Sequence, residues 1–456
     1  MSALNVWLVA PEYAPYVSYG GIGTGLRGFS RALRRRGHRV TVVIPVSERH
    51  EAREFVDDAG IRVVPIVVPG KTDDGYGTDV SADPHAVTHV AVFVRRVVDL
   101  LIASQPRDPV DIVHVHEWPC ALVPYLLRER KTNVATVLTI HNLAYQGLFP
   151  REALSLFGLG PEHASVERLE LYGRISLLKG GIAAADRITT VSPTYAREIQ
   201  TPERGELLDG VFRVRAKDLS GIVNGIDPVE WNPATDAALP ARFDVRNLAG
   251  KRECKRVFCF EHGLPEDKPL VVSLGRLVEQ KGMDWLIDAC PKMIEQGAAI
   301  AIAGSGEPTL EALVKSTAQR FSGRMAALGY VSDAMARRLL AAADFLVMPS
   351  RWEPCGIVQL QAMRYGAIPI ARRTGGLADT IIDADEQPAI ANGFLFDEPS
   401  HAGVLQASTR ALGRYGSAHA EALQKRGMMA MVGWEGPVRK YEEEYRIAMS
   451  RSFEHK

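Results

Sequence analysis

The sequence predicts an α/β protein built from two doubly wound parallel sheets, one in each of two domains. Short runs rich in β-branched residues alternate with longer amphipathic stretches along the chain, as in repeated βαβ units. The runs are apolar nearly throughout, which is typical of strands buried on both faces of a parallel sheet. The alternation stops at a polar segment and then begins again, so we expect two sheets facing a cleft.

Six apolar runs form the first series of expected strands. The amphipathic stretches 25–37 and 85–104 lie between some of these runs and are expected to be helices. The expected strands cover residues 5–10, 39–46, 61–68, 111–116, 134–141 and 187–191.

A second series follows the polar segment. Its expected strands cover residues 269–276, 299–306, 345–350 and 367–373. We expect helices to begin near Asp284, Pro308, Asp333 and Gly356. Ligands of open α/β sheets bind beyond the carboxyl ends of the strands, so the residues that follow these runs are the candidates for a site.

The polar segment 222–240 is rich in proline, asparagine and aspartate, which indicates a connection between domains. We place the first domain at residues 1–235 and the second at 236–432. The last segment, 433–456, is expected to be a helix that is highly charged on one side and packs back on the first domain.

Composition narrows the function classes. The chain has 456 residues, and Lys+Arg and Asp+Glu are equal at 54 each. A balanced surface does not steer nucleic acid or an anionic membrane, so neither is expected as a partner. Five scattered cysteines indicate no disulfide framework and no zinc site. With no signal-peptide pattern and no run of about 18 apolar residues, we expect a cytoplasmic protein; the oligomeric state is not predicted.

A glycine-rich segment begins ten residues after the first expected strand. Glycines let backbone N–H groups approach a phosphate, and the following helix adds a favourable dipole. The last three glycines match the G-x-G-x-x-G dinucleotide fingerprint, with Glu48 about 20 residues on. The segment is therefore either a phosphate-facing loop or a simple turn, and an NAD-dependent dehydrogenase is an alternative. The glycines are Gly20, Gly21, Gly23, Gly25 and Gly28.

Histidines follow two further strands of the first series. His114, His116 and Glu117 end one strand, and His141 ends the next. The H-x-H-E pattern resembles part of a metal site, but no third ligand follows at suitable spacing, so no metal is expected. His141 is either a group that bonds a sugar hydroxyl or one that only shapes its loop.

The second series carries two cations at a strand end. Arg276 ends the expected strand and Lys281 follows five residues later. A guanidinium and an ammonium close to a helix start suit a diphosphate, although a solvated charged loop is the alternative.

The next strands of this series end in further anion-friendly loops. Glu353 ends one strand, and we expect Gly356 to open a helix whose free N–H groups could meet phosphate. Residues 374–376 repeat this design one strand later. Cys355 is interpreted as a small packed thiol. The pair Asp383 and Asp385 matches the aspartates of metal-dependent transferases, but its polar surroundings indicate a solvated loop.

These motifs resemble those of the bacterial glycogen and starch synthases, which are retaining transferases of the two-domain GT-B fold. The resemblance extends over nearly the whole chain. It is carried by residues 139–149 (TIHNLAYQGLF), 185–210, 221–236, 273–284 (SLGRLVEQKGMD) and 348–380.

The resemblance implies a role for each matching residue. Arg276 and Lys281 would hold the donor diphosphate, and Glu353 would contact the transferred sugar. His141 would lie near the reacting carbon. The other implied donor-site residues are Gly20, Gly21, Asn224, Tyr330, Cys355, Gly356, Thr374, Gly375 and Gly376. The implied acceptor-binding residues are Glu117, Asn142 and Tyr145. The nucleotide sugar is a substrate, and the resemblance implies neither a cofactor nor a divalent metal.

Three departures from the family pattern fall in the first domain. Ser18 stands where the family has lysine, Thr24 where it has aspartate, and Glu117 where it has the shorter aspartate. The chain therefore resembles either a synthase that elongates α-glucans or a pseudo-glycosyltransferase of acarbose-type aminocyclitol pathways, which joins a nucleotide-activated cyclitol to an amino sugar. A sugar-binding protein without activity is a further alternative.

Overall fold

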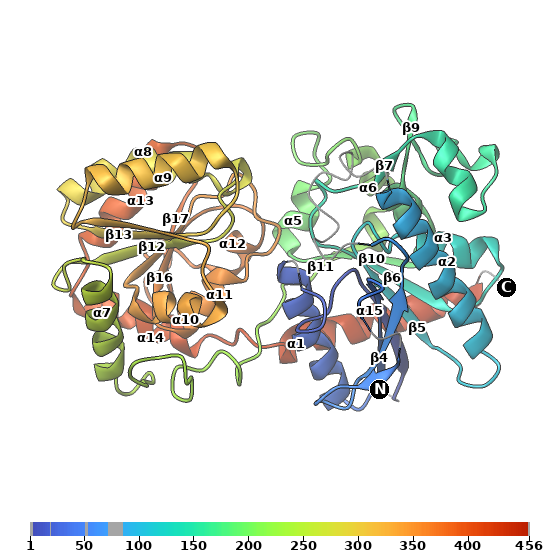
Figure 1. Ribbon diagram of the computed structural model, residues 1–456, viewed down its shortest axis with the longest axis horizontal. Coiled ribbons are helices and arrows are strands. Elements are labelled where there is room, and N and C mark those ends of the chain that lie inside the picture. Colours follow the sequence, from blue (N-terminus) through green and yellow to red (C-terminus); the bar gives the residue numbers. More distant parts are fainter. Residues whose placement is uncertain (1–2, 19, 51–52, 72–84, 455–456) are drawn as a thin grey trace. The chain divides into compact units, whose positions relative to one another are not determined.

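The computed structural model describes residues 3–18, 20–50, 53–71 and 85–454. The chain forms two compact units (Figure 1). The first contains Met1–Gly225 together with Trp434–Lys456, and the second contains Ile226–Gly433.

The first unit is built on an eight-stranded sheet in the order β11-β10-β6-β5-β1-β2-β4-β3. All neighbouring strands pair in parallel except β3, which is antiparallel to β4. The strands are β1 (Asn5–Val9), β2 (Arg39–Val46), β3 (Phe55–Val56), β4 (Arg62–Val67), β5 (Ile112–His116), β6 (Ala135–Ile140), β10 (Arg187–Thr190) and β11 (Leu219–Gly221).

Helices of the first unit pack on this sheet. They are α1 (Gly21–Arg35), α2 (Ala86–Ser104), α3 (Leu122–Glu129), α4 (Leu177–Ala184), α5 (Pro193–Glu198), α6 (Asp209–Val214) and α15 (Glu435–Glu454). A small antiparallel sheet, in the order β7-β9-β8, is made by Leu148–Phe149, Arg174–Ser176 and Glu170–Leu171.

The sheet of the first unit has a hydrophobic core on each face. In β1, Val6 and Leu8 join the core that includes residues of α1 and α15, whereas Trp7 and Val9 join the core that includes residues of α2 and α3. Because successive side chains of a strand point to opposite faces, both sets are buried, which explains why the run is apolar throughout.

The second unit is built on a six-stranded parallel sheet in the order β14-β13-β12-β15-β16-β17. Its strands are β12 (Leu270–Leu274), β13 (Ala299–Ala303), β14 (Met325–Gly329), β15 (Phe345–Met348), β16 (Ile368–Arg372) and β17 (Phe394–Phe396). Its helices are α7 (Ala249–Glu261), α8 (Met283–Glu295), α9 (Pro308–Arg320), α10 (Asp333–Ala342), α11 (Val358–Arg364), α12 (Gly375–Thr380), α13 (His401–Leu412) and α14 (Ala418–Met429).

The second unit begins about ten residues before the expected boundary at 235/236. The polar segment supplies Ile226, Trp231 and Leu239 to the same core as Phe258 of α7. These apolar side chains are spaced too widely among proline, asparagine and aspartate to form a periodic pattern, so the sequence alone suggests a linker.

Two helices do not begin where the sequence predicts. Helix α1 begins at Gly21, so Gly23, Gly25 and Gly28 lie inside a helix and not in a loop. Helix α11 begins at Val358, because Gly356 is left-handed (φ +69°) and cannot open a right-handed helix. The prediction that Gly356 is a helix start is wrong.

Strands β14 and β17 were not expected from the sequence. Their segments, MAALG and FLF, are short and lack the β-branched residues that mark the other strands. Among the described residues, no helix combines the length and apolar character that crossing a bilayer requires. The five cysteines are buried and free.

Candidate active site

In the second unit, an ion pair joins the loops that follow two adjacent strands, β12 and β15. Lys281 Nζ lies 2.5 Å from Glu353 Oε2, and Ser350 donates its hydroxyl to the same oxygen at 3.0 Å. Glu353 is buried, whereas the side chain of Lys281 is about one-quarter exposed. Glu353 Oε1 accepts no hydrogen bond from the described residues, so this oxygen is available to a substrate.

Arg276 follows β12 at the same sheet edge. It is exposed and makes no hydrogen bond or ion pair within the described part of the chain. A guanidinium without a protein partner can bind a diphosphate through two parallel N–H bonds. Tyr330 follows β14, two strands away, and its side chain is 83% exposed.

Close backbone packing holds the loop of Glu353 against the start of α12, the helix that follows β16. The amide of Gly376 donates to the carbonyl oxygens of Glu353 and Pro354, at 3.1 and 3.2 Å. A Cβ on Gly375 would lie 2.0 Å from the carbonyl oxygen of Glu353, and one on Gly376 would lie 1.9 Å from that of Cys355. Because they lack a side chain, these glycines let the start of α12 approach the backbone of the Glu353 loop. The N–H of Gly376 already donates to two carbonyl oxygens of that loop.

At Gly356, where an anion site was expected, the structure has a turn held by a neighbouring side chain. The side chain of Gln359 donates to the carbonyl oxygens of Cys355 and Gly356, at 3.1 and 2.9 Å. It therefore braces the turn that the left-handed Gly356 makes. Ser350 and Gln359 were missed by sequence reasoning; Ser350 could have been found from its place at the end of the β15 run.

The prediction of a solvated loop at Asp383 is wrong. Asp383 is buried, accepts a hydrogen bond from the amide of Leu395 at 2.6 Å, and pairs with Arg410 at 3.2 Å. The backbone and Arg410 lower the pKa of this carboxyl despite the opposing effect of burial. The described residues contain no cluster of three or more His, Cys, Asp or Glu side chains placed to hold a metal ion.

In the first unit, the carboxylate of Glu117 holds the loop that follows β6. Glu117 Oε2 accepts the amides of His141 and Asn142, at 3.1 and 2.9 Å, and Oε1 accepts the amide of Trp118 at 3.2 Å. The residue is buried, and its φ of +67° is in the left-handed region. Burial raises the pKa of Glu117 to about 8, although the three amides favour the charged form.

His141 is linked to the histidines of β5. Its Nε2 lies 3.1 Å from His116 Nδ1, and His114 bonds Tyr445 of α15 and Thr139 of β6. Burial lowers the pKa of His141 to about 4, so its ring is neutral near pH 7. A neutral imidazole can bond a sugar hydroxyl without carrying a charge. Neighbouring Asn142 accepts the amide of Tyr145 at its carbonyl oxygen.

Two buried polar side chains of the first unit lie near the start of α1. Buried Glu12 accepts the amide of Gly20 at 2.9 Å. Asn224, just after β11, is 7% exposed, and its Nδ2 would lie 3.9 Å from a Cβ on Gly25. Gly20 and Gly21 are exposed. Glu12 was missed by sequence reasoning, because a single glutamate near an expected loop carries no distinctive signal.

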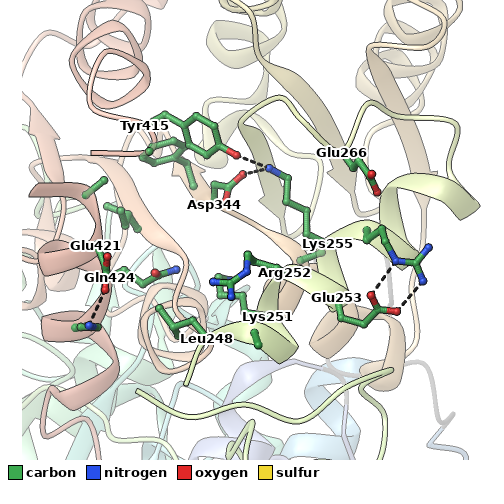
Figure 2. Close-up of a pocket in the computed structure, with 18 of the residues that line it drawn as sticks. Leu248, Lys251, Arg252, Glu253, Lys255, Glu266, Asp344, Tyr415, Glu421 and Gln424 are labelled. Carbon is green, nitrogen blue, oxygen red and sulfur yellow. Dashed lines mark hydrogen bonds and ion pairs between the residues drawn. The ribbon is translucent and has the colours of Figure 1, made fainter. Parts of the chain in front are cut away.

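A hollow of about 860 Å³ lies elsewhere in the second unit, near the amino ends of β15 and β16 (Figure 2). Its charged side chains are largely paired with one another. Lys255 bonds Asp344 and the hydroxyl of Tyr415, and Arg256 pairs with Glu253. Because ligands of parallel sheets bind at the carboxyl ends of strands, this hollow is separate from the candidate active site.

Known proteins resemble this chain over most of its length. Residues 5–214 match the family model of the starch synthase catalytic domain, and residues 255–427 match that of glycosyl transferases group 1. The chain is 36% identical to a glycogen synthase of Geotalea daltonii, over 98% of this chain and 99% of that protein. It is 37% identical to glycogen synthase 2 of Geobacter sulfurreducens, with 98% and 99% covered. The chain belongs to the glycogen and starch synthase family.

This glycosyltransferase also resembles a solved structure over its whole length. The catalytic domain of starch synthase IV from Arabidopsis thaliana, bound to ADP and acarbose, matches it with a TM-score of 0.89 and 30% identity. The match covers 98% of this chain and 100% of that one. The GT-B fold and the resemblance drawn from the motifs are confirmed. The dinucleotide fingerprint therefore does not mark a dehydrogenase.

Proposed function

We propose that this glycosyltransferase moves a glucosyl group from a nucleotide sugar to the end of an α-glucan, with retention of configuration and without a divalent metal. The observation that carries the proposal is the Lys281–Glu353 pair at one edge of the second sheet, where Arg276 also lies with no partner among the residues that the structure describes. ADP bound to the related starch synthase IV supports a nucleoside diphosphate as the leaving group.

In the proposed reaction, an acceptor hydroxyl attacks the anomeric carbon from the face that the diphosphate leaves. The bond between that carbon and the phosphate oxygen breaks, and the hydroxyl proton passes to the leaving phosphate. Arg276 and Lys281 offset the charge that develops on the diphosphate, which is the task that a metal ion performs in other transferases. Glu353 Oε1 bonds the transferred sugar, and the neutral ring of His141 has the chemistry to bond a sugar hydroxyl.

Elongation of a maltooligosaccharide tests this proposal, with ADP-glucose and UDP-glucose assayed in parallel. We expect longer α-1,4 products whose yield is unchanged by EDTA. Glu353→Ala should abolish turnover in a folded protein, whereas Glu295→Ala, an exposed carboxylate of α8, should not. Full activity of the Glu353 variant would refute its assignment, and loss of activity on chelation would refute metal independence.

A second candidate is favoured by the uncharged, exposed Ser18 two residues before Gly20, where the family carries lysine. The chain would then join a nucleotide-activated cyclitol to an amino sugar. In that case no glucan is elongated, and nucleotide is released only with an amino-sugar acceptor. Ser18→Lys separates the candidates, since in a glucan synthase the added cation should lower the donor KM.

We also propose a cytoplasmic location. Five buried free thiols without a disulfide suit a reducing compartment.

A further inference from the structure

A second hollow, of about 550 Å³, lies in the first unit and is lined in part by Tyr16, from the connection between β1 and α1. Its floor is apolar, made by the buried residues Ile44, Val46 and Pro65 of β2 and β4. Val46 is the last residue of β2, so the floor reaches the carboxyl edge of the sheet, where His141 also lies. This volume is within the range of about 300–1,000 Å³ that is typical of ligand pockets.

Two aromatic rings form a wall of this hollow. Tyr16 comes from the connection between β1 and α1, and Phe55 comes from β3; their ring centroids are 4.5 Å apart with an interplanar angle of 58°. Tyr16 is 39% exposed. A sugar ring has one face of C–H groups that packs on such a surface, while its hydroxyls remain at the polar rim.

The rim is polar and carries both signs of charge. Glu54 is held by Arg62, whose Nε and Nη2 donate to Oε2 at 3.0 and 2.7 Å. Arg53 is exposed and has no hydrogen bond or ion pair within the described residues. Fixed acceptors and free donors around an aromatic wall suit a neutral, hydroxyl-rich ring better than an apolar peptide segment.

Hydrogen bonds connect the turn between β3 and β4 to the segment that precedes α1. The hydroxyl of Tyr13 donates to Asp57 Oδ2 at 2.8 Å, and Asp57 Oδ1 accepts the amides of Ala59 and Ile61. Tyr13 also pairs with Val17 through a backbone bridge. The turn between β3 and β4 therefore holds Tyr16 in place, two residues before Ser18.

We propose that the hollow walled by Tyr16 and Phe55 is an acceptor subsite that binds one sugar ring of the acceptor. This inference rests on the proposed function, because it assigns the acceptor of that transfer reaction to a surface of the first unit. It places acceptor binding on the same segment that leads into Gly20 and Gly21.

Binding without donor tests the subsite directly. Maltoheptaose and glucosamine are titrated into the full chain and followed by saturation-transfer NMR. We expect Tyr16→Ala and Phe55→Ala to raise the apparent Kd of the bound sugar roughly tenfold. Tyr16→Phe, which keeps the ring, should retain binding. Val56→Ala is the matched control, since Val56 follows Phe55 on β3 and is 67% exposed but does not line the hollow.

Kinetics give the second readout. With the acceptor that supports transfer, the acceptor KM should rise about as much as the Kd, and the donor KM should change less than twofold. A wild-type protein that binds neither sugar, or alanine variants that bind as the wild type does, would overturn the subsite. Absence of transfer to any glucan contradicts the proposed function instead, and the donor-free comparison still decides the inference.

Discussion

Two buried carboxylates of this enzyme have opposite surroundings. Glu353 shares one oxygen between Lys281 and Ser350, and its other oxygen has no partner in the described part of the chain. Glu117 uses both oxygens on backbone amides. Glu353 therefore has an oxygen left for a substrate, whereas Glu117 is buried with amides on both oxygens, and we expect it to affect the acceptor through the loop that it positions.

Removing the Glu117 carboxylate should damage both stability and activity. Glu117→Ala leaves three amides without their acceptor, and we expect a loss of about 3 kcal/mol in the free energy of unfolding. We also expect kcat to fall at least tenfold, because His141 is no longer held in place. Urea unfolding and initial rates measure the two effects. Glu152→Ala, at an exposed position of the same unit, serves as control, and an equal response of both variants would contradict the prediction.

The raised pKa of Glu117 predicts a pH dependence of stability. Its ordinary pKa of 4.5 rises to about 8 in the folded state, so between these values the folded state holds a proton that the unfolded state has lost. Stability should therefore fall as pH rises from about 4.5 through 8, by up to ~1.4 kcal/mol per pH unit. Unfolding of the wild type and Glu117→Gln across this range isolates the effect, since the variant does not titrate. If the stabilities of the two proteins change with pH in parallel, the three amides offset the effect of burial on the pKa of Glu117.

At the scale of elements, the glycines of α1 show how one pattern can have two physical causes. Gly23-x-Gly25-x-x-Gly28 suggested phosphate binding, yet all three residues lie within the helix. A Cβ on Gly28 would lie 2.3 Å from Trp434 Nε1, and one on Gly23 would lie 3.2 Å from the amide nitrogen of Ala14. Here glycine permits close packing, which a pattern along one segment cannot distinguish from phosphate binding.

Adding a methyl group at Gly28 should weaken the packing of Trp434 on α1. Alanine is the better helix former, but the overlap with the indole ring should outweigh this gain, and we expect a net loss of about 1–3 kcal/mol. Gly436→Ala in α15 is the control, because nothing lies within 4 Å of its added Cβ. It should stabilise by up to ~1 kcal/mol. Calorimetry of both variants compares them, and a Gly28 variant at least as stable as the wild type would contradict the overlap.

The parts predictable from sequence are those set by local patterns. The buried strands β1, β2, β5 and β6 were predicted because burial on both faces requires continuous apolar runs. The pairing of Lys281 with Glu353 was not, because it joins residues 72 positions apart in the chain. The left-handed turn at Gly356 was also missed, since glycine is compatible with a helix start as well as with a turn.

At the scale of the whole molecule, the first unit is completed by the last helix of the chain. Tyr441 and Tyr445 of α15 join the same core as Phe29 of α1. Tyr445 also bonds His114, whose neighbour His116 contacts His141. The core of the first unit therefore contains residues from both ends of the chain, and the second unit lies between them in the sequence.

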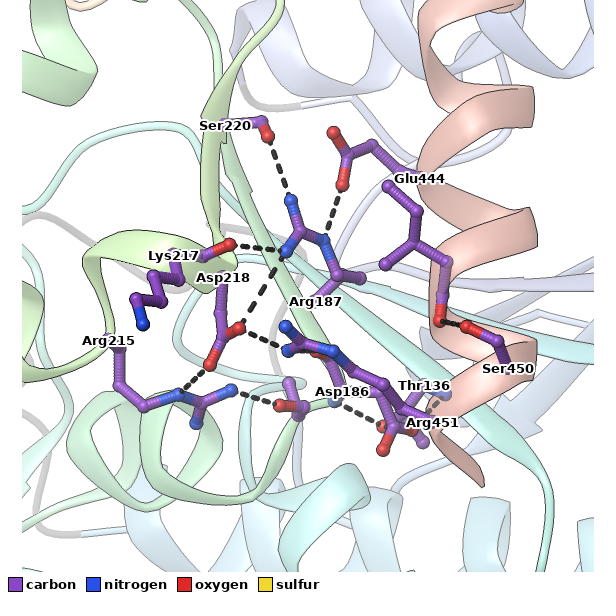
Figure 3. Close-up of polar contacts among 12 residues, drawn as sticks. Thr136, Asp186, Arg187, Arg215, Lys217, Asp218, Ser220, Glu444, Ser450 and Arg451 are labelled. Atoms are coloured by element: carbon purple, nitrogen blue, oxygen red, sulfur yellow. Dashed lines mark hydrogen bonds and ion pairs between the residues drawn. The ribbon is translucent and has the colours of Figure 1, made fainter. Parts of the chain in front are cut away.

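Arg187 of β10 forms an ion pair with the last helix, α15 (Figure 3). Its Nε donates to Glu444 of α15 at 2.6 Å, while its other nitrogens donate to the carbonyl oxygen of Lys217 and the hydroxyl of Ser220. The side chains of Arg187 and Glu444 are only 6% and 10% exposed. Arg187 also lies 3.7 Å from Asp218, so loss of Glu444 would leave it one carboxylate, whereas loss of Arg187 would leave the buried Glu444 charge without compensation.

We therefore expect Arg187→Met to lower the free energy of unfolding of the first unit by about 3–5 kcal/mol. The double variant Arg187→Met/Glu444→Leu should recover most of this loss, because it removes the second charge as well. Glu443→Ala is the control on the same helix; its pair with Arg446 is more than half exposed, so its loss should change stability far less than the loss of Arg187. Calorimetry of the wild type and the variants measures these losses. A double variant as unstable as Arg187→Met would show that the contacts of Arg187 with Lys217, Asp218 and Ser220, and not its pair with Glu444, account for the loss.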